Sequence, residues 1–275
     1  MVSIIIPAHN EERALPRLLD ALQCADGYPS EIVVVANGCS DRTADIARDH
    51  EVTVIETPVP SKIRALALGD QHATAFPRIY IDGDVVLGAE DARALCDALT
   101  GRIQASGPTR HLPMDGVSAP VRWYYDVWQR LDGVRTELYG RGVIAVSEQG
   151  HARIRDWPET MSDDLHLAMS FAPEERTVVP GARVTIRPPK TYADLLRRRV
   201  RAMTGNTRMS AAPGAPPVRG AGATPGALAR MAMTEPRLLP GVVVFVATAA
   251  VSKLLGSRAA RRGDTTWLRD ESSRR

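Results

Sequence analysis

The sequence predicts an α/β fold in which a mainly parallel sheet is flanked by helices. Short apolar runs rich in β-branched residues lie near 2–6, 32–36, 52–55 and 78–81, and segments of helical periodicity follow them near 11–24, 41–49, 61–74 and 90–99. Strands and helices that alternate in this way form right-handed β-α-β units with parallel strands. Polar residues follow several of these strands directly, so we expect them to meet at the sheet edge where ligands bind.

The composition fits a soluble catalytic domain with an appendage. The chain has 275 residues, 44% of them hydrophobic and 24% charged, which is enough for a full core and excludes a disordered or wholly membranous protein. Its three cysteines show neither metal-ligand spacing nor an even disulfide set, which favours a reducing compartment. No signal peptide precedes the first strand, so we expect a cytoplasmic location.

The first predicted strand, Val2–Pro7, leads into Ala8-His9-Asn10-Glu11-Glu12. This turn contains no glycine, so it differs from the Gly-x-Gly-x-x-Gly turn that holds a pyrophosphate in dinucleotide-binding dehydrogenases. Its Asn and Glu side chains suit either a helix N-cap or contact with a nucleotide base. The second strand, Glu31–Ala36, ends in Asn37-Gly38-Cys39-Ser40-Asp41, where the same two interpretations apply.

Two aspartates, Asp82 and Asp84, close the apolar run 79–81 on either side of Gly83. Mg²⁺ or Mn²⁺ is usually held by one or two carboxylates, with water and substrate phosphates completing the shell. The motif therefore predicts a divalent metal site for a nucleotide diphosphate. An ordinary turn is the alternative for this tripeptide alone.

The second half offers aromatic, glycine and acidic candidates. Aromatic residues gather in 121–128, where Trp123, Tyr124 and Trp128 either line an acceptor site or pack a helix on the sheet. Gly140 and Gly142 let the backbone approach a sugar or make a tight turn into the strand 143–146. Asp163 and Asp164 open an amphipathic helix, where capping explains one of the two carboxylates.

The segments Ser3–Glu12, Val34–Thr43, Lys62–Leu66 and Asp82–Asp84 follow one another in an order and spacing that resemble the family 2 glycosyltransferases of GT-A fold. The likeness extends to about residue 205. It implies an inverting transfer from a nucleotide sugar, with Asp164 as the general base and Asp163 in support. The metal ligands implied are Asp84 and Asp82. The donor-binding residues implied are Pro7, Glu11, Asn37, Asp41, Lys62 and Asp82.

Two positions depart from the family pattern. Many members carry Asp where this chain has Asn37, which leaves the preferred base open, because an amide donates as well as accepts. Arg198 and Arg201 occupy the outer positions of a Gln-x-x-Arg-Trp motif of many relatives and share one helical face, where guanidinium groups suit a departing diphosphate. The missing Gln and Trp favour a non-processive transferase. A solvated basic face is the alternative.

The C-terminal part differs in composition. We expect a catalytic domain over 1–204, a Gly/Pro/Ala-rich flexible segment over 205–235, and an apolar helix with a basic tail over 236–275. From Arg183 to Arg262 there are fifteen Arg and Lys against two acidic residues, a local net charge of +13. This balance favours an anionic membrane surface over nucleic acid, for which no motif is present. The apolar run 238–252 is short for a full span, so an interfacial helix or a helix packed on the domain is expected.

The sequence thus predicts a metal-dependent glycosyltransferase on the inner face of the cell membrane. It transfers the sugar to a hydroxyl group of an acceptor, and lipid-linked and envelope-precursor molecules are the candidate acceptors. A sugar nucleotidyltransferase is one alternative, although segment 7–12 lacks its Gly-rich triphosphate loop. A non-catalytic nucleotide-sugar-binding module at the membrane is the other.

Overall fold

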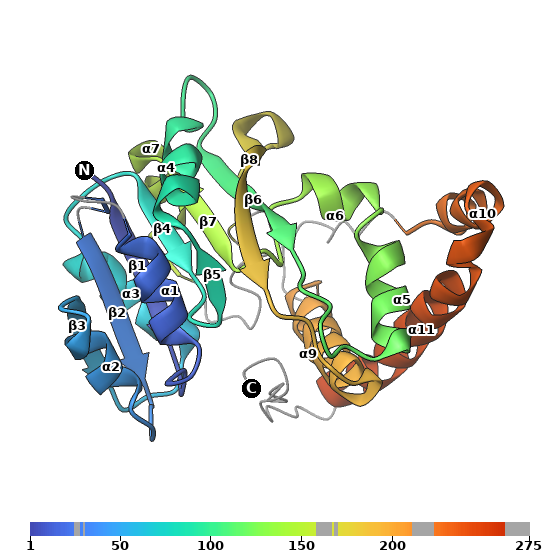
Figure 1. Ribbon diagram of the computed structural model, residues 1–275. Coiled ribbons are helices and arrows are strands. Elements are labelled where there is room, and N and C mark those ends of the chain that lie inside the picture. The colour runs from blue at the N-terminus through green and yellow to red at the C-terminus, as the bar shows by residue number, and fades with distance from the viewer. Residues whose placement is uncertain (25–27, 30, 158–166, 168–169, 211–222, 262–275) are drawn as a thin grey trace.

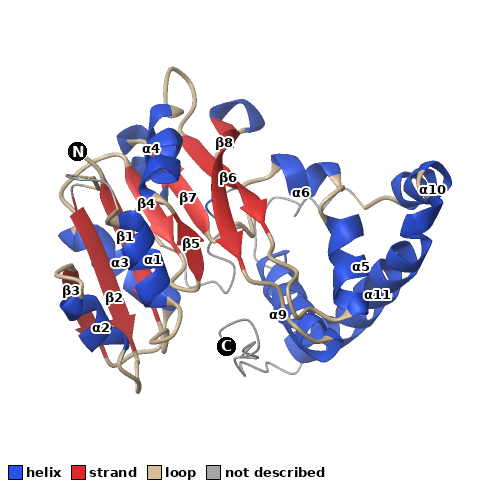
Figure 2. Ribbon diagram, viewed as in Figure 1, coloured by secondary structure: helices blue, strands red, loops and turns tan. Residues whose placement is uncertain are grey.

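The structure is a computed structural model, and it describes residues 1–24, 28–29, 31–157, 167, 170–210 and 223–261. Its strands form one eight-stranded sheet in the order β3-β2-β1-β4-β7-β6-β8-β5 (Figure 1). Helices cover both faces of the sheet, and a separate group of helices lies beside it (Figure 2). The fold is therefore α/β, as predicted.

The first four strands run parallel and alternate with helices, which confirms the prediction for this half. In chain order the elements are β1 (Ser3–Ala8), α1 (Leu15–Leu22), β2 (Glu31–Asn37), α2 (Thr43–Asp49), β3 (Thr53–Thr57), α3 (Lys62–His72) and β4 (Arg78–Ile81). Helix α1 begins later than expected because Pro16 fits the first turn, where its missing N–H leaves no hydrogen bond unmade.

Alternate side chains of β1 pack on opposite faces of the sheet, as the twofold period of a strand requires. Ile4 and Ile6 join a core cluster with residues of α1 and of α4 (Ala89–Asp97). Ile5 joins a cluster on the other face with residues of α3 and α7 (Glu148–Ile154). The parallel strands are thus buried between two helical layers, and their polar ends emerge at one edge.

The second half of the sheet is mixed, so antiparallel pairs join the parallel ones there, while parallel pairs remain the more numerous among the described strands. The remaining strands are β5 (Val85–Leu87), β6 (Ala105–His111), β7 (Val143–Val146) and β8 (Arg176–Ile186). Strand β7 runs antiparallel to β4 and β6, β5 antiparallel to β8, and β6 parallel to β8. These pairings join segments far apart in the sequence, which local periodicity does not encode.

The Asp82–Asp84 segment closes a strong curl of this sheet. It links β4 to β5, yet three other strands lie between them in the sheet order. In a flat sheet they would be about 19 Å apart, since neighbouring strands lie about 4.8 Å from each other. The linking segment reaches about 14 Å at most. The part of the sheet from β4 to β5 therefore curls into a half-barrel, and the two aspartates lie where the edge strand β5 comes back to β4.

The C-terminal helices form a group beside the sheet (Figure 1). This helical group contains α5 (Ala119–Trp128), α9 (Tyr192–Ser210), α10 (Pro225–Thr234), the short η2 (Pro236–Leu238) and α11 (Leu239–Arg261). Helix α11 packs along both α5 and α9. The short α6 (Asp132–Thr136) and η1 (Pro173–Glu175) precede β7 and β8.

The predicted flexible segment 205–235 is helical at both ends. Helix α9 crosses the expected domain boundary at residue 204, and α10 covers Pro225–Thr234, while 211–222 lie outside the described residues. Glycine and proline content alone predicted a linker here, but Pro225 and Gly226 stand in the first turn of α10, where both are tolerated.

Candidate functional site

The ends of β1 and β2 are joined by side chains of the loops that follow them. The Asn37 amide donates to the carbonyl of Ala8 at 2.8 Å and is 3% exposed. His9 Nδ1 lies 2.6 Å from the Asn37 carbonyl. Asn10, which has a positive φ of 53°, accepts from the Ser40 N–H at 2.7 Å. These contacts fix the two loops relative to each other, and the Asn37 amide is used to hold the strand ends.

Asp41 and Thr43 continue this cross-linking. Asp41 accepts hydrogen bonds from the backbone N–H groups of Thr43 at 3.0 Å and Glu12 at 3.2 Å. The Thr43 hydroxyl in turn accepts from the Glu11 N–H at 2.7 Å. Asp41 therefore stabilises the start of α2 from the position before its N-cap residue, Arg42, and also shapes the turn after β1.

Helix α3 brings Lys62 to the end of β4. A Cβ on Gly69 would lie 2.4 Å from Ile5 Cγ2, so this glycine allows the helix to approach β1 closely. Ser61 caps the helix by accepting from the Arg64 N–H. Lys62, in the first turn, forms an ion pair with Asp82 in which Nζ and Oδ1 are 2.5 Å apart.

The Gly140–Gly142 turn supports Asp82 from the other side. The Asp82 N–H donates to the Gly142 carbonyl at 2.8 Å. Gly142 has a φ of +66°, and a Cβ there would lie 2.8 Å from Val85 Cγ1, so both conformation and space require glycine. Gly140, with a φ of +67°, completes the turn.

Glu11 and the Asp82 motif lie in contact across the sheet edge. A Cβ on Gly83 would meet Glu11 Cγ at 3.2 Å, and Glu11 is 6% exposed. Pro7, Lys62, Asp82 and Gly142 line one small cavity of about 20 Å³, room for a water molecule but not for a sugar. The structure thus brings together most of the predicted donor residues with one predicted acceptor glycine.

The Asp82–Asp84 pair fits a divalent metal that relies on its substrate for ligands. Among the residues that the structure describes, no group of three or more His, Cys, Asp and Glu gathers for a metal. Two carboxylates at a strand end are nevertheless the protein ligands that Mg²⁺ uses when phosphates and water complete its shell. The Lys62 ammonium next to Asp82 adds positive charge at the same place.

Other predicted site residues lie in the helical group or outside the described residues. Arg198 and Arg201 are half-buried on α9. Asp163 and Asp164 lie outside the described residues, so the structure does not place the proposed base.

The aromatic residues of α5 take part in helix packing. Tyr124 is buried and stacks on Phe245 of α11 with ring centroids 5.3 Å apart. Burial raises the pKa of Tyr124 to about 12, although the nearby charges of Arg199 and Arg198 oppose this. Trp128 stacks under the Arg110 guanidinium at 5.1 Å, and Trp123 is 43% exposed. Helix α5 therefore packs mainly on α11 and also on α9, whereas the alternative interpretation expected it to pack on the sheet.

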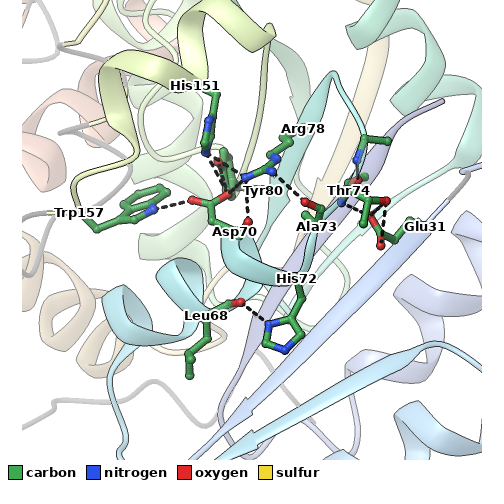
Figure 3. A network of polar contacts seen from close by, with 12 residues as sticks. Glu31, Leu68, Asp70, His72, Ala73, Thr74, Arg78, Tyr80, His151 and Trp157 are labelled. Carbon is green, nitrogen blue, oxygen red and sulfur yellow. Dashed lines mark hydrogen bonds and ion pairs between the residues drawn. The ribbon is translucent and has the colours of Figure 1, made fainter.

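A buried polar network lies behind the site (Figure 3). Asp70 of α3 accepts hydrogen bonds from Arg78 at 2.7 Å, Tyr80 at 2.8 Å and the Trp157 indole at 2.7 Å. His151 Nε2 lies 3.3 Å from the same carboxylate. Burial raises the pKa of Asp70, but the hydrogen bonds from these four residues outweigh it and lower the pKa below its usual value. The network therefore holds an ionised Asp70 against Arg78.

This network joins the helix that carries Lys62 to α7 and to Trp157, which directly precedes the segment containing Asp163 and Asp164. Sequence reasoning did not single out Asp70. The available signal in the sequence was Asp70, on the helix that begins at Lys62, together with Arg78 at the start of the next strand. Pairs of this kind are common on protein surfaces.

Comparisons with known proteins agree with this geometry. Residues 3–117 match the family described as glycosyl transferase family 2. A curated relative, 4,4'-diaponeurosporenoate glycosyltransferase of Staphylococcus aureus, is 26% identical over 168 residues, which cover 54% of this chain and 44% of the relative. The chain thus matches less than half the length of that relative.

Solved structures show the same fold. A mannosyltransferase from Pyrobaculum calidifontis in complex with GDP-Man and Mn²⁺ has a TM-score of 0.60 at 22% identity, covering 96% of this chain and 81% of that one. Glucosyl-3-phosphoglycerate synthase from Mycobacterium tuberculosis, in complex with Mn²⁺, UDP and glucosyl-3-phosphoglycerate, has a TM-score of 0.54 at 18% identity, covering 76% and 79%. Residues 3–117 therefore resemble the family 2 glycosyltransferases, and the chain has the GT-A fold of these solved structures.

Proposed function

We propose that this protein is an inverting glycosyltransferase that moves a sugar from a nucleoside diphosphate donor to an acceptor hydroxyl. The observation that carries the proposal is the Lys62–Asp82 ion pair beside Asp84, set against the cross-linked loops after β1 and β2. This arrangement combines carboxylates and a cation with a turn fixed by hydrogen bonds. It therefore suits both the charged diphosphate and the nucleobase of the donor. The matched relatives are glycosyltransferases, which favours this function over nucleotidyl transfer or simple binding.

In this proposal the donor lies along the sheet edge. Pro7, Glu11 and Asp41 border the base and ribose, while Asn37 shapes this border by holding the strand ends. Lys62 and Asp82 lie toward the ribose and diphosphate, and Arg198 and Arg201 supply further positive charge for the departing diphosphate.

Asp164 acts as the general base, with Asp163 in support. An ionised Asp accepts the proton of the acceptor hydroxyl as that oxygen attacks the anomeric carbon, and general base catalysis contributes about 10²–10⁴ in rate. A single displacement with one base inverts the anomeric configuration.

A divalent cation, Mn²⁺ or Mg²⁺, is held by Asp84 and Asp82 in this proposal. When bound, it would neutralise charge on the leaving diphosphate. Two of the similar solved structures contain Mn²⁺ with a nucleotide or nucleotide sugar, which supports this choice of cofactor. The Lys62 ammonium holds Asp82 in place, so one of the two carboxylates is positioned before the donor arrives.

The direct test is a panel of nucleotide sugars, GDP-Man and UDP-Glc among them, incubated with the full chain and Mn²⁺ or Mg²⁺. Membrane extract supplies the acceptor. The proposal expects metal-dependent release of nucleoside diphosphate with at least one donor and none from Asp164→Asn. Absence of release with every donor, or equal release from Asp164→Asn, contradicts it.

Helix α11 supports a location at the membrane. The segment Pro236–Arg258, which includes most of α11, is by length and composition long and apolar enough to cross a membrane, and an 18-residue stretch within it has a mean hydropathy of 2.1. One face packs through Gly241, Phe245 and Gly256 on α5 and α9. The opposite face exposes apolar side chains at helical spacing: Leu239, Val243, Val246, Val251, Leu254 and Leu255.

The packed face favours a helix that lies in the interface over one that spans the bilayer, because spanning requires separation from α5 and α9. Two exposed basic residues, Lys253 before Leu254 and Arg258 after Leu255, accompany the apolar face and suit an anionic leaflet. The proposal therefore places the enzyme on the inner face of the cell membrane, close to lipid-linked or envelope-precursor acceptors.

A further inference from the structure

A second, larger cleft lies on the other side of the turn that supports Asp82. It has a volume of about 840 Å³ and is bounded by β6, β8 and α6. This volume is within the range of sites for small molecules, about 300–1,000 Å³. Leu138 and Gly142 line the small cavity at Asp82, whereas Glu137 and Arg141 of the same segment line the cleft.

Arg141 is a buried cation in the wall of this cleft. It is 2% exposed, and its guanidinium donates only to backbone carbonyls in the contacts of the described residues: Pro108 at 2.6 Å, Arg135 and Glu137 at 2.9 Å, and Val134 at 3.2 Å. Burial lowers the pKa of Arg141 to about 9, with the charge of Arg110 adding to the effect. The group is therefore still cationic at neutral pH, in surroundings where a buried charge is costly.

Two more guanidinium groups accompany it. Arg110 donates to the carbonyls of Gly140, Val134 and Tyr139, which directs its charge to the same segment. Arg176 forms an ion pair of 2.7 Å with Glu137.

Positive charge is in excess in the cleft. Among the described residues that line the cleft, the inner wall holds three arginines and one carboxylate: Arg110, Arg141, Arg176 and Glu137. At the rim, the charges of Arg135 and Asp132 balance each other. An anion entering the cleft would offset this excess. Planar guanidinium groups match the oxygens of carboxylate and phosphate in particular.

We propose that this cleft binds a small ligand that carries a phosphate or carboxylate group, at a site separate from the donor site. The ligand meets Arg135 at the rim of the cleft and the largely buried Arg176 in its inner wall, and the buried charge of Arg141 strengthens its binding from behind. Glu137 competes with the ligand for Arg176. Such an anion comes either as a free metabolite or as the acidic group of an acceptor.

The test measures binding of inorganic phosphate and of glycerol 3-phosphate to the full chain by calorimetry at constant ionic strength, without donor. Arg135→Gln and Arg176→Gln should each weaken binding by about tenfold, the loss expected for one charge-assisted hydrogen bond. Glu137→Gln should tighten it, because Arg176 then loses its competitor. Arg102→Gln, which removes an exposed arginine outside the cleft, should leave it unchanged.

Equal affinities in all four variants, or weaker binding in Glu137→Gln, would overturn the proposal. Retained wild-type melting temperatures show that losses do not come from unfolding. A further arm distinguishes the two sources and rests on the proposed function. Glycosylation of glycerol 3-phosphate in the presence of a donor identifies the ligand as an acceptor, whereas binding without consumption identifies a free anion.

Discussion

Asp70 lies in the core behind the candidate site, and its charge is balanced within the protein by Arg78. Replacing Asp70 by Asn leaves the buried guanidinium without its counter-charge, which typically destabilises a protein by about 3–5 kcal/mol. We expect Asp70→Asn to lower the free energy of unfolding by about this amount in chemical denaturation. The exposed Asp97→Asn is the matched control and should change little.

The same residue predicts a dependence on pH. The pKa of Asp70 is lowered on folding, so its stabilisation is complete above the pKa of an unfolded Asp, about 4, and is lost as pH falls through the lower folded-state pKa. The wild type should therefore lose more stability than Asp70→Asn between pH 5 and 2. Parallel curves for the two proteins would contradict the ionised pair.

At the residue scale the sequence predicts which residues gather but not all of their roles. Asp82, Lys62 and Gly142 lie together in the structure, at strand ends and a glycine turn that local pattern points to. The amide of Asn37 holds backbone carbonyls. Arg141 and Asp70 were not singled out, because their burial depends on strands and helices distant in the sequence.

At the scale of elements, the position of Lys62 depends on how closely α3 approaches β1. Gly69→Ala places a methyl group 2.4 Å from Ile5 Cγ2, and overpacking of this kind costs about 1–3 kcal/mol, even though Ala favours a helix over Gly by about 1 kcal/mol. We expect Gly69→Ala to lower both stability and donor affinity, measured by thermal unfolding and calorimetry.

Gly226→Ala is the matched control for this substitution. Gly226 lies in α10, and a Cβ there meets nothing within 4 Å, so the substitution should be neutral or stabilising. A Gly69→Ala protein as stable as Gly226→Ala would show that the close approach of α3 does not position the site.

Elements of the first half were predictable because twofold and 3.6-residue periods are local, and β1 to β4 follow them. The pairing of β6 with β8 and of β5 with β8 was not, since it joins residues about 70 to 100 positions apart that sheet curvature brings together. The helices beyond residue 205 were missed in part because glycine and proline at helix starts look like linker residues.

At the scale of the whole molecule, the exposed apolar face of α11 is a second contact surface, in addition to the face that packs on α5 and α9. Val243 and Leu254 are 66% and 53% exposed on its apolar face, so replacing both by Glu should leave the fold intact. We expect Val243→Glu/Leu254→Glu to reduce flotation with anionic vesicles by at least about tenfold, since each buried apolar side chain contributes about 1.5–3 kcal/mol.

The control for vesicle binding adds the same charge elsewhere. Gln71→Glu/Thr100→Glu substitutes two exposed residues outside the helical group and should float like the wild type. Removal of α11 is a poorer test, because Phe245 stacks on Tyr124 and its loss would expose the core of the helical group. Equal flotation of both double variants would argue against membrane docking by this face.

In the proposed mechanism, the Asp82–Asp84 strand end and the base candidate Asp164 perform separate tasks in one glycosyl transfer. Calorimetry of donor binding, with and without Mn²⁺, tests it most directly on the wild type, Asp84→Ala and Asp164→Asn. We expect metal-dependent binding in the wild type, its loss in Asp84→Ala, and retained binding without turnover in Asp164→Asn. Equal donor affinity in the wild type and Asp84→Ala would contradict the metal site, and unchanged turnover in Asp164→Asn would contradict the base.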